Sequence, residues 1–153
     1  MNMEAKERNR EKNLIADLLN AASEQEWEKI DDEIIPQLAK SDGNIVAEQL
    51  LEYVDETPDI RDAVATGLAV LRIKNREIKK RAIEAMIKMA EEDEEMFPAG
   101  RAAVFLLGNR RDPELGNQVM AAIETFRTRV KDKKDWIEGL SENIRQLKRL
   151  LTE

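Results

Sequence analysis

Apolar residues recur along most of the chain at intervals of three and four positions, which is the period of an amphipathic α-helix. No segment shows the strict alternation of apolar and polar residues that marks a half-buried strand. Short turns that contain Gly, Pro, Asn or Asp separate the periodic segments. The pattern predicts an all-α protein of about eight helices, near residues 4–21, 26–40, 44–56, 59–73, 76–93, 98–109, 114–131 and 136–151.

Residues at the predicted helix ends agree with these boundaries. Ser23 with Glu26, and Asp135 with Glu138, have the spacing of a capping box, and Asp112 is placed to cap the helix that follows it. Three prolines fall in predicted first turns, where a missing N–H costs nothing: Pro58, Pro98 and Pro113. Two glycines stand where helices should stop and where a left-handed residue is useful: Gly43 and Gly108.

The apolar pattern repeats in three helix pairs. In the second helix of each pair, four apolar positions recur at internal offsets of four, five and eight residues, and successive units are offset by 32 and 37 residues. The matched positions are Val46, Ile78 and Leu115; Leu50, Ala82 and Val119; Leu51, Ile83 and Met120; and Val54, Met86 and Ile123. In the first helices they are Ile35, Leu68 and Val104, and Leu38, Leu71 and Leu107. One pair cannot cover its own apolar stripe, so the repeat predicts stacked pairs in a solenoid. A compact helical bundle would need the same stripes and is the alternative.

The first pair carries the most distinctive sequence. Its first helix contains Glu33-Ile34-Ile35-Pro36-Gln37-Leu38, in which Pro36 predicts a kink. The polar turn Ser41-Asp42-Gly43-Asn44 follows, and then Ile45-Val46 and Leu50-Leu51. This arrangement resembles the HEAT-repeat family, and the third pair, with Asp112-Pro113-Glu114-Leu115 at its turn, is similar.

The resemblance covers about residues 28–126, but the middle pair departs from it. Lys74-Asn75-Arg76-Glu77 replaces the aspartate turn there, and this pair has no proline. The resemblance implies a single domain, a right-handed α–α superhelix whose repeat pairs span residues 26–131. Capping helices would cover its ends, at residues 1–25 and 132–153. It implies a fold and no particular activity.

Composition excludes several kinds of site. The 153 residues include neither cysteine nor histidine, which removes disulfides, thiolate zinc sites, cysteine nucleophiles and the usual general base near neutral pH. No cofactor or small-molecule substrate is indicated. The first twelve residues are charged throughout, and no apolar run approaches the length of a membrane span. A cytoplasmic protein without membrane contact is therefore expected.

The net charge of −7 is unevenly distributed along the chain. Residues 1–58 hold 15 acidic and 6 basic residues, whereas residues 59–153 hold 17 acidic and 19 basic ones. Five of the latter acids form one run, Glu91 to Glu95, so the acidic total conceals a basic C-terminal half. Such asymmetry is a pointer to a polar partner.

In a HEAT-like stack the second helices line the concave face, where such proteins hold partners. The polar positions there would be Glu48, Gln49, Glu52, Tyr53, Lys80, Arg81, Lys88, Asn117, Gln118 and Thr125. This surface would run from acidic through basic to neutral. It predicts a non-catalytic protein-interaction or scaffold module that binds a protein or peptide. Ordinary solvated helix faces would carry the same residues and are the alternative.

Two other functions compete with this one. The basic stretches at 72–81 and 127–134 suggest binding to a nucleic-acid backbone, although interspersed acids and the lack of nearby aromatic residues speak against it. Glu91, Glu92 and Glu95 fit the E-E-x-x-E element of helical nucleotide pyrophosphatases, which hold magnesium. The next predicted helix, 98–109, has no acid to complete that site, so a metal-dependent hydrolase ranks third. Glu28, Asp31 and Asp32 share a helix face as well.

A few remaining residues carry packing expectations. Trp27 and Trp136 lie just after capping residues near the two ends of the array, where packing under the terminal helices is expected and exposure would mark a contact site. Gly67 inside a helix predicts the close approach of a neighbouring helix. Four methionines at helical spacing or at a turn are expected to fill gaps in the core: Met86, Met89, Met96 and Met120.

Overall fold

The computed structural model describes the backbone of residues 3–132 and the side chains from residue 9 onward. Every regular element in this range is helical, which confirms the prediction of an all-α fold. The chain begins with α1 (Met3–Ser23), α2 (Trp27–Lys29), the π-helical turn η1 (Ile30–Ile34) and α3 (Ile35–Ala39). It continues through α4 (Gly43–Leu50), the 3-10 turn η2 (Leu51–Tyr53), α5 (Pro58–Val70), α6 (Arg76–Glu92), α7 (Met96–Leu107) and α8 (Gly116–Val130). The predicted helix 136–151 and its cap lie outside the described residues.

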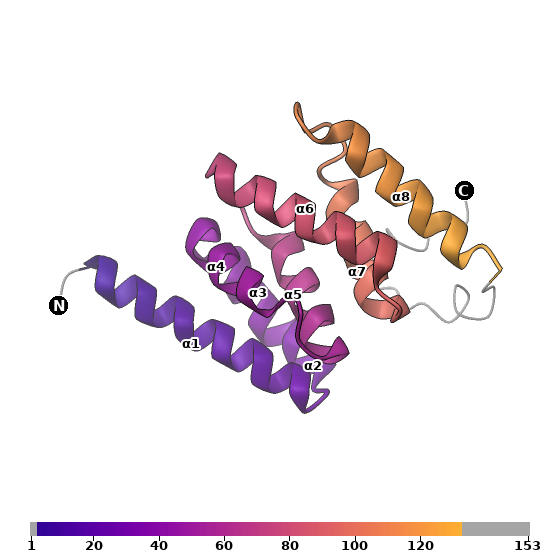
Figure 1. Cartoon of the computed structure of the whole chain (residues 1–153). Helices are drawn as coiled ribbons and strands as arrows, with labels where there is room; N and C mark the ends of the chain where they lie inside the picture. The colour runs from indigo at the N-terminus through magenta and orange to yellow at the C-terminus, as the bar shows by residue number, and fades with distance from the viewer. Residues whose placement is uncertain (1–2, 133–153) are drawn as a thin grey trace.

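The helices form two rows, and neighbours in each row touch. One row contains α3, α5 and α7 in succession, and the other contains α4, α6 and α8. Helix α1 packs against α4 and α5 at the start of both rows (Figure 1). The buried apolar side chains form one continuous cluster that runs from Leu14 in α1 to Val130 in α8.

Most of the matched apolar positions face this core. Eleven of the twelve second-helix positions are buried or pack against the core, and Met120 is the exception with 46% of its surface exposed. Leu51 and Ile83, the counterparts of Met120, are buried, and another helix of the row follows each of them, whereas α8 is the last helix of its row in the described part of the chain. Met86 and Met89 are buried as expected.

The predicted irregularity at Pro36 takes the form of a π turn. Proline has no N–H to donate to the preceding turn, and the helix widens just ahead of it. The Ile35 N–H donates to Ile30 O, one residue farther back than in an α-helix. The side-chain Nε2 of Gln37 also donates to Glu33 O at 2.9 Å, within the same irregular segment.

The capping box predicted between Ser23 and Glu26 is wrong, as the turn between α1 and α2 shows. Ser23 belongs to the last turn of α1, and Glu26 precedes α2 without a side-chain cap. Instead, α1 ends on a left-handed residue, Gln25, with φ 57°. The Glu26 N–H donates to Ala21 O at 2.8 Å and the Gln25 N–H to Ala22 O at 3.0 Å, which is the Schellman pattern. The spacing of Ser23 and Glu26 predicted the start of a helix, but the backbone hydrogen bonds of this turn terminate α1.

The glycines matter because they leave room for close neighbours, and not because they adopt a left-handed backbone conformation. Neither Gly43 nor Gly108 has a positive φ, so the expected left-handed stops are wrong. Gly43 begins α4, where a Cβ atom would lie 2.1 Å from Arg72 O. A Cβ atom on Gly67 would lie 3.0 Å from Leu50 Cδ1, which confirms the predicted close approach of a neighbouring helix. Proline placement is confirmed for Pro58 and Pro98, while Pro113 lies in the turn that precedes α8.

Asp42 caps α4 and Asn75 caps α6, whereas Asp112, predicted to cap the next helix, caps the turn that leads into α8. Asp42 Oδ1 accepts two backbone N–H groups, Asn75 Oδ1 accepts one, and Asp112 Oδ2 accepts two, at 2.9–3.1 Å. Such caps stabilise a helix by about 1 kcal/mol. The middle turn looked different in sequence, yet Asn75 supplies the same capping oxygen as the two aspartates.

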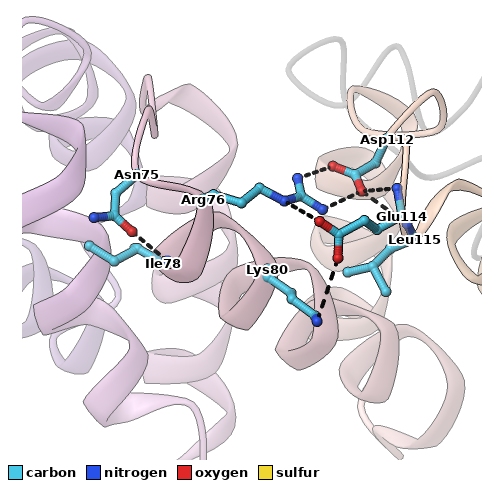
Figure 2. Close-up of polar contacts among 7 residues, drawn as sticks. All are labelled: Asn75, Arg76, Ile78, Lys80, Asp112, Glu114 and Leu115. Carbon is cyan, nitrogen blue, oxygen red and sulfur yellow. Dashed lines mark hydrogen bonds and ion pairs between the residues drawn. The ribbon is translucent and has the colours of Figure 1, made fainter.

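We call the side of the molecule formed by residues 41–44, 71–76 and 108–116 the N-cap edge. Its turns are bonded to one another. Asn44 Oδ1 accepts the backbone N–H groups of Lys74 and Asn75, both at 2.9 Å. From the next turn, Arg76 donates to both carboxylate oxygens of Asp112 at 2.6 and 2.8 Å, and to Glu114 at 3.2 Å (Figure 2).

A third polar link joins the first row. Asp62 of α5 is 8% exposed, and Arg101 of α7 donates to its Oδ1 at 3.2 Å. Burial raises the pKa of Asp62, and the Arg101 charge opposes that rise. The pair joins adjacent helices of the row across an otherwise apolar contact.

Candidate functional site

The predicted partner-binding residues lie along the second row. Because α4, α6 and α8 lie side by side, the structure brings residues from all three helices onto one row. Most of them are exposed to solvent: Glu48, Glu52, Arg81, Lys88, Asn117, Gln118 and Thr125. Gln49, Tyr53 and Lys80 are partly buried.

Two of the predicted residues make contacts that join them to other parts of the molecule, while Thr125 donates only to Ala121 O of its own helix, at 3.0 Å. Tyr53 packs against the apolar core. Lys80 Nζ lies 3.6 Å from Glu114 Oε2, beside the Arg76 pair, so it helps to join α6 to the turn before α8 (Figure 2). These contacts give both side chains a structural role.

The other ionic residues on this row have no such role. The side chains of Glu48, Glu52, Arg81 and Lys88 make no hydrogen bond or ion pair with any other described residue. The charges exposed on α6 alternate in sign, because the exposed Glu84 lies between Arg81 and Lys88. The middle of the row is therefore mixed in charge, where the sequence suggested a basic segment.

A stronger separation of charge runs across the molecule. Three segments rich in acids lie together opposite the N-cap edge, at residues 24–33, 55–59 and 91–95. Gln25 Nε2 donates to Asp59 Oδ2 at 3.3 Å, and Arg61 joins Asp93 at 2.7 and 2.9 Å, so the three segments are neighbours. We call them the acidic edge.

The two edges differ clearly in composition. The acidic edge holds fourteen acidic residues and one basic residue, Lys29, whereas the N-cap edge holds five basic and three acidic residues. Helix α6 runs from one edge to the other over 17 residues, a length of about 25 Å. The difference in charge between chain halves thus becomes a difference between two sides of one helix array.

The two basic stretches do not form one surface. Residues 72–81 lie at the start of α6, at the N-cap edge. Arg129, from the second stretch, donates to Ala90 O at 2.7 Å and also to Asp93 O at the other end of α6. Arg127 pairs with Glu124 at 2.9 Å. Both arginines in the described part of the second stretch are therefore occupied with structural contacts.

The acidic runs do not bring their carboxylates together into a metal site. Glu91 and Glu92 lie in the last turn of α6, and Glu95 precedes α7. Within residues 9–132, no three acidic side chains come close enough together to hold a metal ion. The spacing of Glu28, Asp31 and Asp32 is altered as well, because the latter two lie in the π turn η1.

Trp27 was expected to pack under a terminal helix, and this prediction is wrong because 37% of its surface is exposed on the acidic edge. Trp136 lies outside the described residues. Phe97 at the start of α7 is also exposed, at 53%. Exposed aromatic side chains of this kind are common anchors of protein contacts.

Sequence reasoning missed the residues that connect the units. Asn44, Arg61, Arg76 and Arg129 each reach a group more than 29 positions away, and no local pattern identifies such partners. One signal was available: Asp42, Asn75 and Asp112 stand just before the repeated apolar positions, so aligning Asx residues would have revealed the common cap.

No protein-family model, no curated protein and no solved structure matches this chain. None of the described helices combines the length and the apolar character needed to cross a bilayer.

Proposed function

We propose that this chain is a short HEAT-like α-solenoid that binds a protein partner on the second-helix row, without catalysis. Two features support the solenoid. Neighbouring helices of each row contact one another, and an Asp or Asn caps α4, α6 and the turn that leads into α8. A compact bundle would not require equivalent turns to be bonded in sequence along one edge.

The observation that carries the binding proposal is the different use of ionic side chains. Arg61, Arg76, Arg101 and Arg129 are all held by carboxylates or carbonyl groups. Arg81 and Lys88 on the second-helix row have no partner among the described residues. Charged groups that stabilise nothing in the chain itself are available for a partner, where they add specificity and speed of association.

The test reverses the free charges and leaves the paired Lys80 unchanged. Arg81→Glu with Lys88→Glu should abolish capture of a specific partner from the native source, because repulsion replaces attraction. Lys12→Glu with Lys40→Glu makes the same change of net charge at exposed positions off the row and should retain capture. Equal capture by both double variants would refute the assignment of this surface.

A second candidate function rests on the N-cap edge. Arg72, Lys74, Arg110 and Arg111 lie on the neighbouring turns that Arg76 and Asp112 join. Such a cluster supports contact with a phosphate backbone, which should weaken steeply with salt. Fluorescence anisotropy with labelled single- and double-stranded DNA and RNA tests it, and no binding at low salt would eliminate it.

A further inference from the structure

A groove of about 470 Å³ opens on the acidic edge, between the start of α5 and the C-terminal half of α6. Its lining includes apolar side chains, among them Val54, Pro58, Ala85 and Met89. The volume lies in the range of pockets that accept a small number of side chains or a small ligand. Lys88 of the second-helix row also lines this groove, so the groove continues that row at its acidic end.

The walls of the groove are held in place by hydrogen bonds of Arg61 and Asp93, which leave the side chains of the other lining carboxylates free. Arg61 spans the gap from α5 to Asp93, and its Nη1 donates to Glu56 O at 2.6 Å. Asp93 Oδ1 also accepts the Glu95 N–H at 3.0 Å, which fixes the turn between α6 and α7. Arg129 holds the carbonyl groups at the end of α6 from the outside. A groove framed in this way needs little rearrangement to bind.

The charge left over at the groove is negative. Asp93 is neutralised by Arg61, but the carboxylates of Asp55, Glu92, Glu94 and Glu95 have no ion-pair partner among the described residues. Of the two cations in the lining, Arg61 is paired with Asp93, and Lys88 has no ion-pair partner among the described residues. The rim therefore presents an excess of negative charge around an apolar interior.

We infer that this groove binds a cationic segment of a protein partner, in which lysine or arginine flanks a Leu, Ile or Met side chain. The apolar lining accepts the aliphatic side chain, and the rim carboxylates pair with the flanking cations. This inference rests on the proposed protein-binding function and adds the chemistry of the partner. It concerns the segment of the partner that enters the groove, whereas Arg81 on the row would meet an acidic part of the same partner.

The test measures binding of a labelled peptide of alternating leucine and lysine by fluorescence anisotropy, with the full chain. Ala85→Phe fills the groove without changing the charge and should weaken binding by about tenfold or more. Glu92→Gln with Glu94→Gln, at exposed positions, should weaken it by about threefold to tenfold, and more at low salt. A peptide with serine in place of leucine should lose about tenfold, since the apolar contact is lost.

The matched control is Glu28→Gln with Glu33→Gln, which removes the same charge from the acidic edge outside the groove. It should change the affinity by less than about twofold. Equal weakening by the two double variants, or no effect of Ala85→Phe in a protein with native circular dichroism, overturns the groove assignment. The groove variants leave Arg81 and Lys88 unchanged. If the row double variant keeps partner capture while Ala85→Phe weakens peptide binding, the row assignment is wrong and the groove assignment stands. If the row double variant loses capture while Ala85→Phe has no effect on peptide binding, the groove assignment alone is wrong.

Discussion

The two edges of the helix array use polar residues in opposite ways. On the N-cap edge, carboxylates and amides meet backbone N–H groups or a guanidinium, and each turn is bonded to the next. On the acidic edge, Arg61 satisfies one carboxylate while most of the others face solvent without a partner among the described residues. One edge holds the units together, and the other keeps its charge available. Substitutions at the N-cap edge should therefore change stability, and substitutions at the acidic edge should mainly change binding.

The largest expected effect is at Gly43. Alanine there would place Cβ 2.1 Å from Arg72 O and 2.6 Å from Arg72 C, so backbone atoms must move apart. We expect Gly43→Ala to reduce the free energy of unfolding by about 3 kcal/mol, measured by urea denaturation. In the control Gly108→Ala, the new Cβ meets Phe105 O at an ordinary 3.6 Å. It should be neutral or stabilising by up to about 1 kcal/mol, and a similar loss in both variants would disprove the close approach.

The next largest effect is expected at Asp112, which both pairs with Arg76 and caps a turn. Asp112→Ala should destabilise the protein by about 2 kcal/mol at pH 7. Glu114→Gln, at an exposed partner of the same arginine, should change stability by less than about 0.5 kcal/mol. A loss of equal size at Glu114 would show that the capping bonds are not the main contribution.

The same residue gives a pH dependence. The Arg76 guanidinium and the capped N–H groups hold the pKa of Asp112 well below its ordinary value of 3.8. The carboxylate stabilises the fold above that ordinary value, and the stabilisation is lost as the pH falls toward the lower folded-state pKa. The difference between wild type and Asp112→Ala should accordingly shrink below about pH 4, as denaturation at pH 7 and pH 3 will show.

A smaller and opposite effect is expected at Glu11, which lies against Ser41 and Asp42 of the N-cap edge. Its side chain is buried, Oε2 has no hydrogen-bond partner among the described residues, and burial raises its pKa above 4.5. A raised folded-state pKa means that stability is lost as the pH rises through it. Glu11→Gln should thus stabilise by about 1 kcal/mol at pH 7 and have little effect below pH 4.5. The exposed control Glu24→Gln should change little at either pH.

The smallest effect tests the acidic edge itself. Gln25 adopts a left-handed conformation that suits glycine better, although its side chain donates to Asp59. Gln25→Gly should raise the free energy of unfolding by about 0.5 kcal/mol, net of the lost hydrogen bond. Gln25→Ala keeps the strained conformation without that bond and should be neutral or slightly destabilising. If Gln25→Gly destabilises the protein, the hydrogen bond to Asp59 outweighs the backbone strain. The acidic edge would then contribute more to stability than we propose.

The sequence by itself determined the helices and their buried faces. Spacing of apolar residues placed the seven helical segments that lie in the described part of the chain, and residues such as Leu50, Ile83 and Val119 are buried at the matched positions. This information is local, since three to four residues per turn set both the helix and its apolar side. The close approach at Gly67 could also be predicted from the sequence, because a glycine within a helix is costly unless a neighbouring helix needs the space. Pro36 signalled an irregular first helix, though not that a π turn would relieve it.

Only the tertiary structure decided which polar groups are used and which are free. Arg76 and Arg81 are five positions apart on α6, yet one is fixed by Asp112 and the other has no described partner. Their surroundings come from segments more than thirty residues away, which helix periodicity does not encode. The opposed edges arose in the same way, because folding brought residues 24–33, 55–59 and 91–95 to one side. Charge along the chain predicted a gradient along the array, but stacking of the units placed the main difference across it.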